Sequence, residues 1–121
     1  MDCYIYAADC YCEKCGESIR AGIDRAGIAP NDLDDETTFD CGVYPKGPFA
    51  DAGGEADTPQ HCGSGEDCLD PTVIAGEKYG RFLENDLTHA GVEYVRELHA
   101  DRPTPVTEFW AGWYNSHGYS I

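Results

Sequence analysis

The amino-acid sequence predicts a small α+β fold, organised as one domain over residues 1–121. Three observations carry this prediction. Tyrosine and isoleucine near the N-terminus favour a strand, and two helical patterns with capping residues occupy the last third of the chain. Between them, glycine and proline recur so often that no helical or strand period develops. We therefore expect a short sheet with a β-hairpin, a long irregular acidic loop and C-terminal helices.

A strand and a helix are predicted in the N-terminal part of the chain. Residues 3–9, Cys-Tyr-Ile-Tyr-Ala-Ala-Asp, favour a short strand. A helix is expected from about Ser18 to Ala26, because serine is a good N-cap and Gly27 can end the helix. The cysteine-rich residues between them would connect the strand to the helix.

The C-terminal part contains a predicted hairpin and two predicted helices. Residues 72–83 favour a β-hairpin that turns near Gly76. Thr88 is a capping residue for a helix that reaches about Ala100. Thr104–Pro105 is typical of the start of a further helix. One face of that last helix would be aromatic, with Phe109, Trp110, Trp113, Tyr114 and His117.

Residues 31–70 hold most of the negative charge. They contain eleven acidic residues and one basic residue, Lys46, which is net −10 out of a formal total of −15. A surface of this kind repels DNA, RNA and anionic lipid at long range, and it attracts basic partners. We therefore expect no direct binding of nucleic acid, and a basic protein partner that contacts residues 31–70.

A calcium site is the alternative to a solvated acidic loop in this segment. The candidate ligands would be Asp32, Asp34, Asp35 and Glu36. An EF-hand loop also needs a glycine at its sharp turn and a distal glutamate, and this sequence lacks both at the required spacing. A solvated loop is therefore the favoured interpretation.

The chain has few aliphatic residues and many cysteines. Leu, Ile, Val and Phe make up 20 of 121 residues, below the level of about 20% at which highly charged chains tend to be disordered. Seven cysteines and many aromatic residues argue against disorder, and such a chain usually needs cross-links or metal to hold its shape. Seven cysteines cannot all pair within one chain, so bound metal in a reducing compartment is favoured over disulfides.

Cys12-Glu-Lys-Cys15-Gly16 is the strongest local signal for a metal site. Two thiolates separated by two residues can bind one ion, and Gly16 would permit a positive φ that turns backbone amides toward the sulfurs. The partner pair that the sequence offers is separated by five residues, which is wider than usual. The predicted zinc ligands are Cys12, Cys15, Cys62 and Cys68, with His61 as the substitute if Cys68 is not used.

Two other interpretations of the cysteines stay open. C-x-x-C is also typical of thioredoxin-like redox pairs, although no βαβ pattern surrounds it and acidic neighbours raise thiol pKa values. The cysteines can also serve as small buried hydrophobic residues. Cys3, Cys10 and Cys41 are expected to be buried thiols rather than ligands, with Cys10 near the metal.

No membrane-spanning or export segment is expected. The sequence has no run of 18 apolar residues, and its first residues lack the basic and apolar stretches of a signal peptide. We therefore expect a cytoplasmic protein.

Several short motifs follow one another along the chain in a fixed order. They are Tyr44-Pro-Lys-Gly-Pro-Phe49, Gly53-Gly-Glu-Ala-Asp57, Pro59-Gln-His-Cys62 and Phe82-Leu-Glu-Asn85. With the C-x-x-C-G motif before them, they resemble a group of small uncharacterised proteins of phages and their bacterial hosts, over roughly three-quarters of the chain. The resemblance supports the pairing of Cys12 and Cys15 with Cys62 and Cys68. It implies a phage or bacterial setting and nothing about mechanism.

The expected role is a small acidic zinc-binding protein that acts as a protein-interaction module. A phage-encoded inhibitor, or a DNA mimic that occupies a basic nucleic-acid channel, would fit this description. The alternative is a zinc-dependent or thiol redox enzyme of unknown substrate, but a closed four-thiolate site leaves no open position on zinc. A zinc-ribbon protein that binds nucleic acid is disfavoured by the charge.

Overall fold

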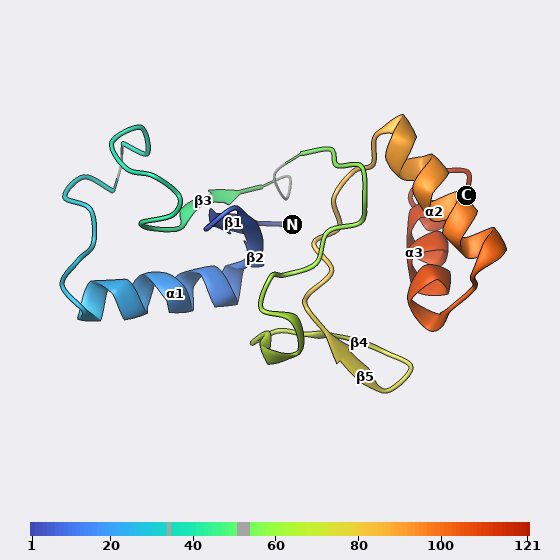
Figure 1. The fold of residues 1–121 in the computed structure, drawn as a ribbon, viewed down its shortest axis with the longest axis horizontal. Coiled ribbons are helices and arrows are strands. Elements are labelled where there is room, and N and C mark those ends of the chain that lie inside the picture. The colour runs from blue at the N-terminus through green and yellow to red at the C-terminus, as the bar shows by residue number, and fades with distance from the viewer. Residues whose placement is uncertain (34, 51–53) are drawn as a thin grey trace.

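The computed structural model describes residues 1–33, 35–50 and 54–121, and it confirms the α+β class with two small sheets and three α-helices. The first sheet and the first helix lie at one end of the molecule, and the last two helices lie at the other (Figure 1). In chain order the elements are β1 (Cys3–Tyr6), β2 (Asp9–Cys12), α1 (Glu13–Arg25), β3 (Lys46–Phe49), the short 3-10 helix η1 (Gly65–Asp67), β4 (Thr72–Ile74), β5 (Glu77–Tyr79), α2 (His89–Asp101) and α3 (Pro105–Ser116).

β1 and β2 form a tight antiparallel hairpin in place of the single strand predicted over residues 3–9. The chain reverses at Ala7 and Ala8, whose φ angles of 50° and 62° lie in the left-handed region. Turns of this kind usually contain glycine, asparagine or aspartate, so two alanines do not signal a reversal. The Ala7 N–H donates to the Cys41 carbonyl oxygen at 2.9 Å. The predicted strand is therefore confirmed over Cys3–Tyr6, and its extension to Asp9 is wrong because the chain reverses at Ala7 and Ala8.

The three-stranded sheet has the order β2-β1-β3, with β1 antiparallel to both neighbours. Cys3 lies opposite Cys12 across the β1–β2 pair. Both side chains are buried, so this end of the hairpin faces a core made largely of cysteines.

Helix α1 begins at Glu13, five residues before the predicted start at Ser18, and it ends at Arg25. Cys12 closes β2 and is also the N-cap of the helix, with the extended φ and ψ angles of −64° and 166° that an N-cap adopts. The predicted start of the helix was wrong because it was placed at a serine cap. Cys12, the last residue of β2, already has the backbone conformation of an N-cap, so the helix begins directly after the strand. Cys15 therefore lies in the first turn of a helix.

Gly16 serves close packing, and the positive φ predicted for it is wrong. It lies inside α1, and its Cα approaches the ring of Tyr4 on β1. A Cβ at this position would overlap the ring, at 2.5 Å from Cγ and 2.7 Å from Cβ of Tyr4. Tyr4 is itself buried, so neither group has space to withdraw. Glycine at position 16 therefore allows α1 to pack against the sheet.

Replacing Gly16 with alanine is expected to lower the free energy of unfolding by about 1–3 kcal/mol, the usual cost of overpacking a core. Gly112→Ala is the matched control, because Gly112 also lies inside a helix but has open space where the methyl group of alanine would lie. That control should instead raise stability by about 0.5–1 kcal/mol, since alanine favours helix over glycine. Urea unfolding of both variants measures the difference, and shifts of the same sign would contradict the packing role of Gly16.

The segment over residues 31–70 is irregular for most of its described length, as predicted, but it contains β3 and η1. Regular structure was not predicted here because β3 includes both glycine and proline, which are rare in strands. β3 forms an edge of its sheet, where proline is tolerated. Asp34, a candidate ligand of the calcium alternative, and Gly53, part of one motif, lie outside the described residues.

The predicted hairpin over residues 72–83 is confirmed in its turn and shortened in its second strand. Ala75 and Gly76 have φ angles of 51° and 82°, which places the reversal at Gly76 as predicted. The chain leaves the hairpin after Tyr79 and pairs with an earlier segment instead. Phe82 forms an isolated antiparallel bridge with His61 in that pairing.

The two C-terminal helices begin at the predicted caps. The Thr88 hydroxyl accepts a hydrogen bond from the Gly91 N–H at 3.1 Å, and Thr104 forms a capping box with Thr107. Within the described part of the chain, no helix is both long enough and apolar enough to cross a membrane.

The aromatic face of α3 is docked against the rest of the molecule. Phe82 lies at the centre of the contact, with ring centroids 5.4 Å from Phe109, 5.1 Å from Trp113 and 5.9 Å from Tyr114. These three contacts are edge-to-face, a favourable geometry for aromatic rings. The buried Tyr114 hydroxyl donates to the Asn85 carbonyl oxygen at 2.9 Å. A second, aromatic core therefore complements the cysteine-rich one.

Candidate metal centre

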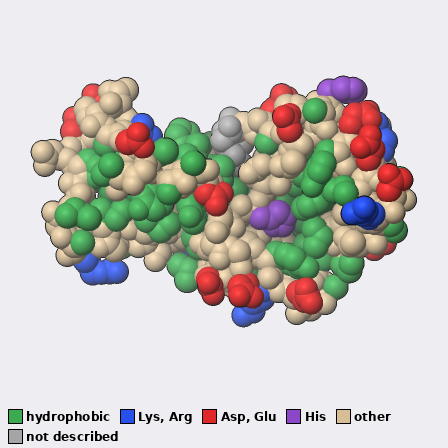
Figure 2. All heavy atoms as spheres, in the orientation of Figure 1, with side chains coloured by type: hydrophobic (Ala, Val, Ile, Leu, Met, Phe, Trp, Pro, Cys, Tyr) green, Lys and Arg blue, Asp and Glu red, His purple; other side chains and the backbone are tan. Residues whose placement is uncertain are grey.

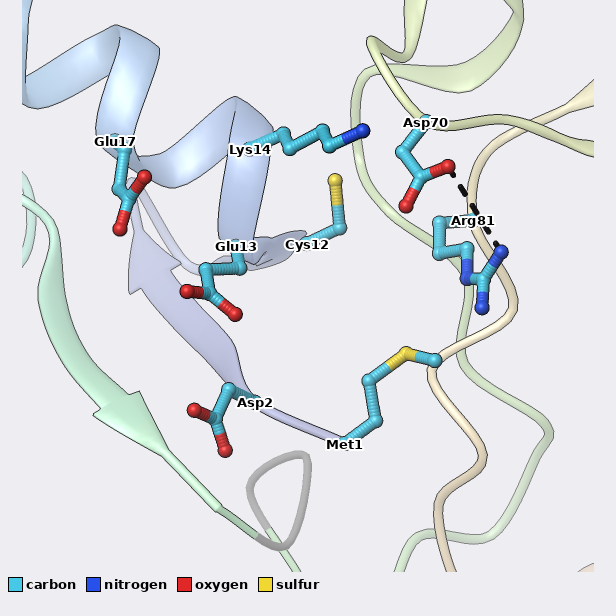
Figure 3. Close-up of a pocket in the computed structure, with 8 residues that line it drawn as sticks. All are labelled: Met1, Asp2, Cys12, Glu13, Lys14, Glu17, Asp70 and Arg81. Atoms are coloured by element: carbon cyan, nitrogen blue, oxygen red, sulfur yellow. Dashed lines mark ion pairs between the residues drawn. The ribbon is translucent and has the colours of Figure 1, made fainter.

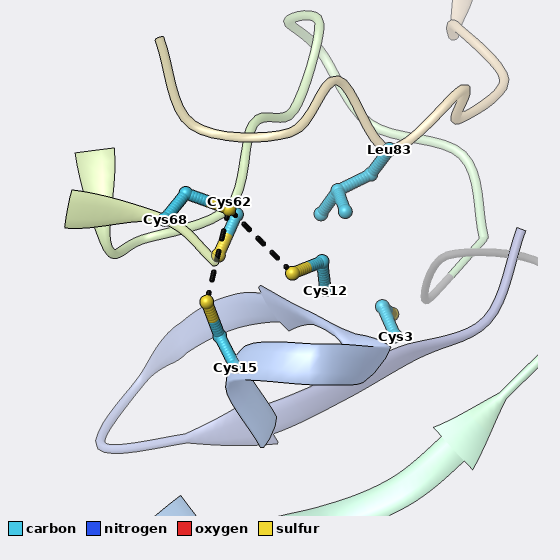
Figure 4. Packing of buried hydrophobic residues seen from close by; sticks show 6 residues of the cluster. All are labelled: Cys3, Cys12, Cys15, Cys62, Cys68 and Leu83. Carbon is cyan, nitrogen blue, oxygen red and sulfur yellow. Dashed lines mark hydrogen bonds between the residues drawn. The ribbon is translucent and has the colours of Figure 1, made fainter. Parts of the chain in front are cut away.

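Four cysteines from two distant segments meet in the first core. Cys12 and Cys15 come from the N-cap and first turn of α1, and Cys62 and Cys68 lie on either side of η1. All four are buried, and their sulfur atoms lie within 4.8 Å of one another. Figure 4 shows the four side chains converging from these elements, with the buried Leu83 beside them. The predicted set of four ligands is thus brought together in one cluster.

Two of the sulfur–sulfur distances match the edge of a tetrahedral metal–thiolate site, and all of them are within 4.8 Å. The Cys68 sulfur lies 3.6 Å from that of Cys12 and 3.7 Å from that of Cys15. Four sulfurs around a zinc ion at about 2.3 Å would be separated by about 3.8 Å along each edge of the tetrahedron. Disulfide sulfurs would instead be bonded at about 2.0 Å. The arrangement therefore fits a metal ion among four separate thiolates.

Backbone hydrogen bonds hold the segment of Cys62 against β2 and against the segment that follows β5. The Cys62 N–H donates to the Arg81 carbonyl oxygen at 2.8 Å, and the Gly63 N–H donates to the Cys10 carbonyl oxygen at 2.7 Å. Gly80 lies so close that a Cβ there would overlap the Cys62 carbonyl oxygen. Gly63 and Gly80 are residues that the sequence did not identify as part of the site, because nothing in their local sequence shows that distant segments meet there.

The wide spacing of Cys62 and Cys68 is explained by the turn between them. η1 occupies Gly65–Asp67, and the Cys68 N–H donates to the Gly65 carbonyl oxygen at 3.1 Å. Gly65 has a φ angle of 59°, a conformation that glycine adopts without strain. This compact turn returns the chain to the cluster, so five intervening residues are accommodated.

Burial and hydrogen bonding both shift the pKa values of the thiols in the cluster. Burial raises the pKa of the Cys12 thiol and that of the Cys62 thiol. Burial acts in the same direction on Cys15, but hydrogen bonds from the Ser64 side chain and the Leu69 N–H outweigh it and lower the pKa of Cys15. The Leu69 N–H lies 3.3 Å from the Cys15 sulfur. A bound cation would offset the cost of burying thiolates, which favours metal binding by these groups.

A pocket of about 390 Å³ lies beside the cluster and reaches Cys12. Lys14 extends along it from the first turn of α1, and Arg81 lines the opposite wall with Asp70 (Figure 3). The Arg81 guanidinium and the Asp70 carboxylate are 3.9 Å apart. Asp2, Glu13 and Glu17 line the same pocket, so its carboxylates outnumber the side-chain cations of Lys14 and Arg81.

His61 lies outside the cluster, and both of its ring nitrogens have other partners. The indole N–H of Trp110 donates to Nε2 at 3.0 Å, so Nδ1 carries the proton and donates to the Gly80 carbonyl oxygen at 2.6 Å. Burial lowers the pKa of His61, which favours this neutral form. Cys68 lies in the cluster as the fourth predicted ligand, so His61 is not needed as its substitute. The sequence did not reveal that His61 connects the metal-centre loop to α3.

The three other cysteines differ in exposure. Cys3 is buried in the cysteine-rich core, as expected. Cys10 and Cys41 are partly exposed, so the prediction that they are buried was wrong. Cys10 packs against the cluster from the same hairpin as Cys12, near the metal site as expected. A hydrogen bond with Cys3 lowers the pKa of Cys10 to about 7, although burial and Asp9 oppose this shift.

Comparison with protein-family models, with curated proteins and with solved structures gives no match. The resemblance to small phage proteins therefore stays a prediction. The function has to be inferred from the geometry of the site and from the charge of the surface.

Proposed function

We propose that the chain is a zinc-stabilised protein-interaction module that binds a basic partner through the acidic surface of residues 31–70. The observation that carries the zinc part of this proposal is the buried cluster of four cysteine sulfurs, all within 4.8 Å of one another. Thiolates are soft ligands, and a tetrahedral set of four is typical of zinc or an iron–sulfur centre. The four sulfurs are close enough to bind one ion together, and this closeness and the C-x-x-C motif favour zinc.

A structural role for zinc is favoured over a catalytic one by the ligand set. Catalytic zinc usually has three protein ligands and keeps a position for water or substrate. Four buried cysteines fill all positions of a tetrahedral ion, and they join α1 to the segment that leads to the aromatic core. The ion would therefore replace the aliphatic core that the composition does not supply.

The proposed binding surface is supported by its charge and exposure. Asp32, Asp35 and Asp40 are exposed, and the only basic residue between positions 31 and 70 is Lys46. Opposite charge speeds the encounter of two proteins and selects between partners. A basic protein that normally holds DNA or RNA, in a bacterial cell that hosts a phage, is the partner that this surface fits best.

Neutralising the acidic surface tests this function. The variant that replaces Asp32, Asp34 and Asp35 with asparagine and Glu36 with glutamine should lose a partner captured from a bacterial lysate, because its charge attraction is removed. Capture by the original chain should weaken as salt rises, and added DNA should compete. Quantitative mass spectrometry of the captured proteins provides the measurement.

The matched control removes four acidic charges from the other end of the molecule. Glu84, Glu97, Asp101 and Glu108 are exposed there and become amides in this variant. It should keep the partner, and both variants should keep their metal. Equal capture by the surface variant and the original chain would contradict the proposed function.

A further inference from the structure

A groove of about 630 Å³ opens on the surface beside the C-terminal end of α1. The loop that follows the helix supplies its walls, including Ile28, Phe39 and Val43. Ile28 is 69% exposed and Val43 is 53% exposed, so the groove presents apolar surface to solvent. In the space-filling view, hydrophobic side chains spread over the end of the molecule that carries α1 and this loop, with acidic side chains next to them (Figure 2).

The walls of the groove are anchored to the sheet and the helix. Tyr44 is buried behind them, and its hydroxyl donates to the Asp24 carboxylate on α1 at 3.2 Å. The ring of Phe39 meets the ring of Tyr44 edge to face, with centroids 5.8 Å apart. The Val43 N–H donates to the Asp40 carbonyl oxygen at 3.0 Å. These contacts hold the groove in shape before any partner arrives, which reduces the entropy lost on binding.

Acidic side chains lie on the rim of the same groove. Asp32 and Asp40 line it. One oxygen of Asp40 accepts a hydrogen bond from the Gly42 N–H at 2.7 Å, and a carboxylate has further lone pairs for a cationic donor. Residues 28–44 contain five acidic residues and no basic one. The groove therefore combines apolar walls with acidic side chains on its rim.

The charge decides which occupant fits. A second copy of this chain carries the same net charge of −15 and would be repelled, and nucleic acid and anionic lipid would be repelled as well. A polypeptide with lysine or arginine beside apolar side chains satisfies both parts of the groove. Amphipathic segments are recognised in this way, with apolar anchors in a groove and charges at its edge.

We infer that this groove binds a cationic amphipathic segment of the partner protein, with one or two apolar side chains between Ile28 and Val43 and basic side chains against Asp32 and Asp40. The inference rests on the proposed function. It adds recognition of apolar side chains to a surface that would otherwise select its partner by charge alone. It also explains why apolar side chains stay exposed within an acidic loop.

Fluorescence anisotropy with a labelled 14-residue peptide of leucine and lysine, arranged to form an amphipathic helix, tests the inference. The original chain should bind it, and the double variant Ile28→Ser, Val43→Ser should bind about tenfold more weakly, since two buried apolar contacts are lost. The matched control is Val73→Ser, Tyr94→Ser, because these residues are 59% and 40% exposed and lie outside the groove. It should bind as tightly as the original chain. Amide shifts in NMR spectra of the complex should map to residues 28–32 and 38–43.

A second peptide, with serine in place of leucine, separates charge from apolar recognition. If the two peptides bind with equal affinity, or if the groove variant binds as tightly as the original chain, the proposed apolar recognition by the groove is contradicted. The proposed binding of a basic partner by the acidic surface would not be affected by that result. If neither cationic peptide binds the original chain, peptide binding by the groove is also contradicted. Capture of a partner from the lysate would then test the proposed function independently. All variants should retain metal and the circular dichroism of the original chain, which confirms that they fold.

Discussion

Cys62→Ser is expected to remove the bound metal and unfold the chain. Binding of structural zinc contributes about 10–16 kcal/mol in small zinc domains, and the net stability of a typical domain is only about 5–15 kcal/mol. A variant that leaves three thiols cannot complete the tetrahedron that joins α1 to the segment around η1. Native mass spectrometry should show one zinc per chain in the original protein and none in the variant, and circular dichroism should show loss of helix.

Cys41→Ser is the control for this experiment. Cys41 is partly exposed and lies outside the cluster of four, so its serine variant should keep the metal and the fold. Loss of metal from Cys41→Ser to the same degree as from Cys62→Ser would contradict the assignment of ligands.

Phe82→Ala is expected to lower the free energy of unfolding by about 3–5 kcal/mol, the usual cost of removing a buried phenylalanine. Phe82 is 3% exposed, and three aromatic rings of α3 meet it edge to face. All three rings lie on α3, so filling the space that Phe82 leaves would require movement of this helix or of its side chains. Chemical denaturation followed by tryptophan fluorescence is the measurement.

Tyr94→Ala provides the comparison for Phe82→Ala. Tyr94 is an exposed aromatic residue on α2, so its removal should change stability by less than about 0.5 kcal/mol. Phe82→Ala should keep one metal per chain, since Phe82 belongs to the aromatic core and not to the cysteine cluster. A cost below about 1 kcal/mol would show that the aromatic core does not hold α3 in place.

Local signals in the sequence were sufficient for the C-terminal helices and for the membership of the cysteine cluster. Thr88, Thr104 and Pro105 act through their immediate neighbours, so the helix starts can be placed from these residues alone. The C-x-x-C motif likewise fixes two sulfurs on one side of an ion, and the chain offers few candidates for the other side.

Contacts between distant segments account for the features that could not be predicted. Two alanines form a left-handed turn because Ala7 is tied to Cys41, and Gly16 is required because Tyr4 packs against it. The two alanines have no turn-forming sequence, and the C-x-x-C-G motif that contains Gly16 does not indicate a contact with Tyr4. The pairing of His61 with Trp110 is of the same kind, because a histidine beside a cysteine is more readily taken for a ligand than for a link to a helix.

The coordination of the metal can be measured directly by X-ray absorption at the zinc edge of the purified protein. Four buried cysteine sulfurs within 4.8 Å of one another predict a first shell of four sulfur atoms at about 2.3 Å and no lighter ligand. A shell that contains nitrogen or oxygen, or a purified protein that holds no zinc, would contradict a structural zinc ion bound by Cys12, Cys15, Cys62 and Cys68.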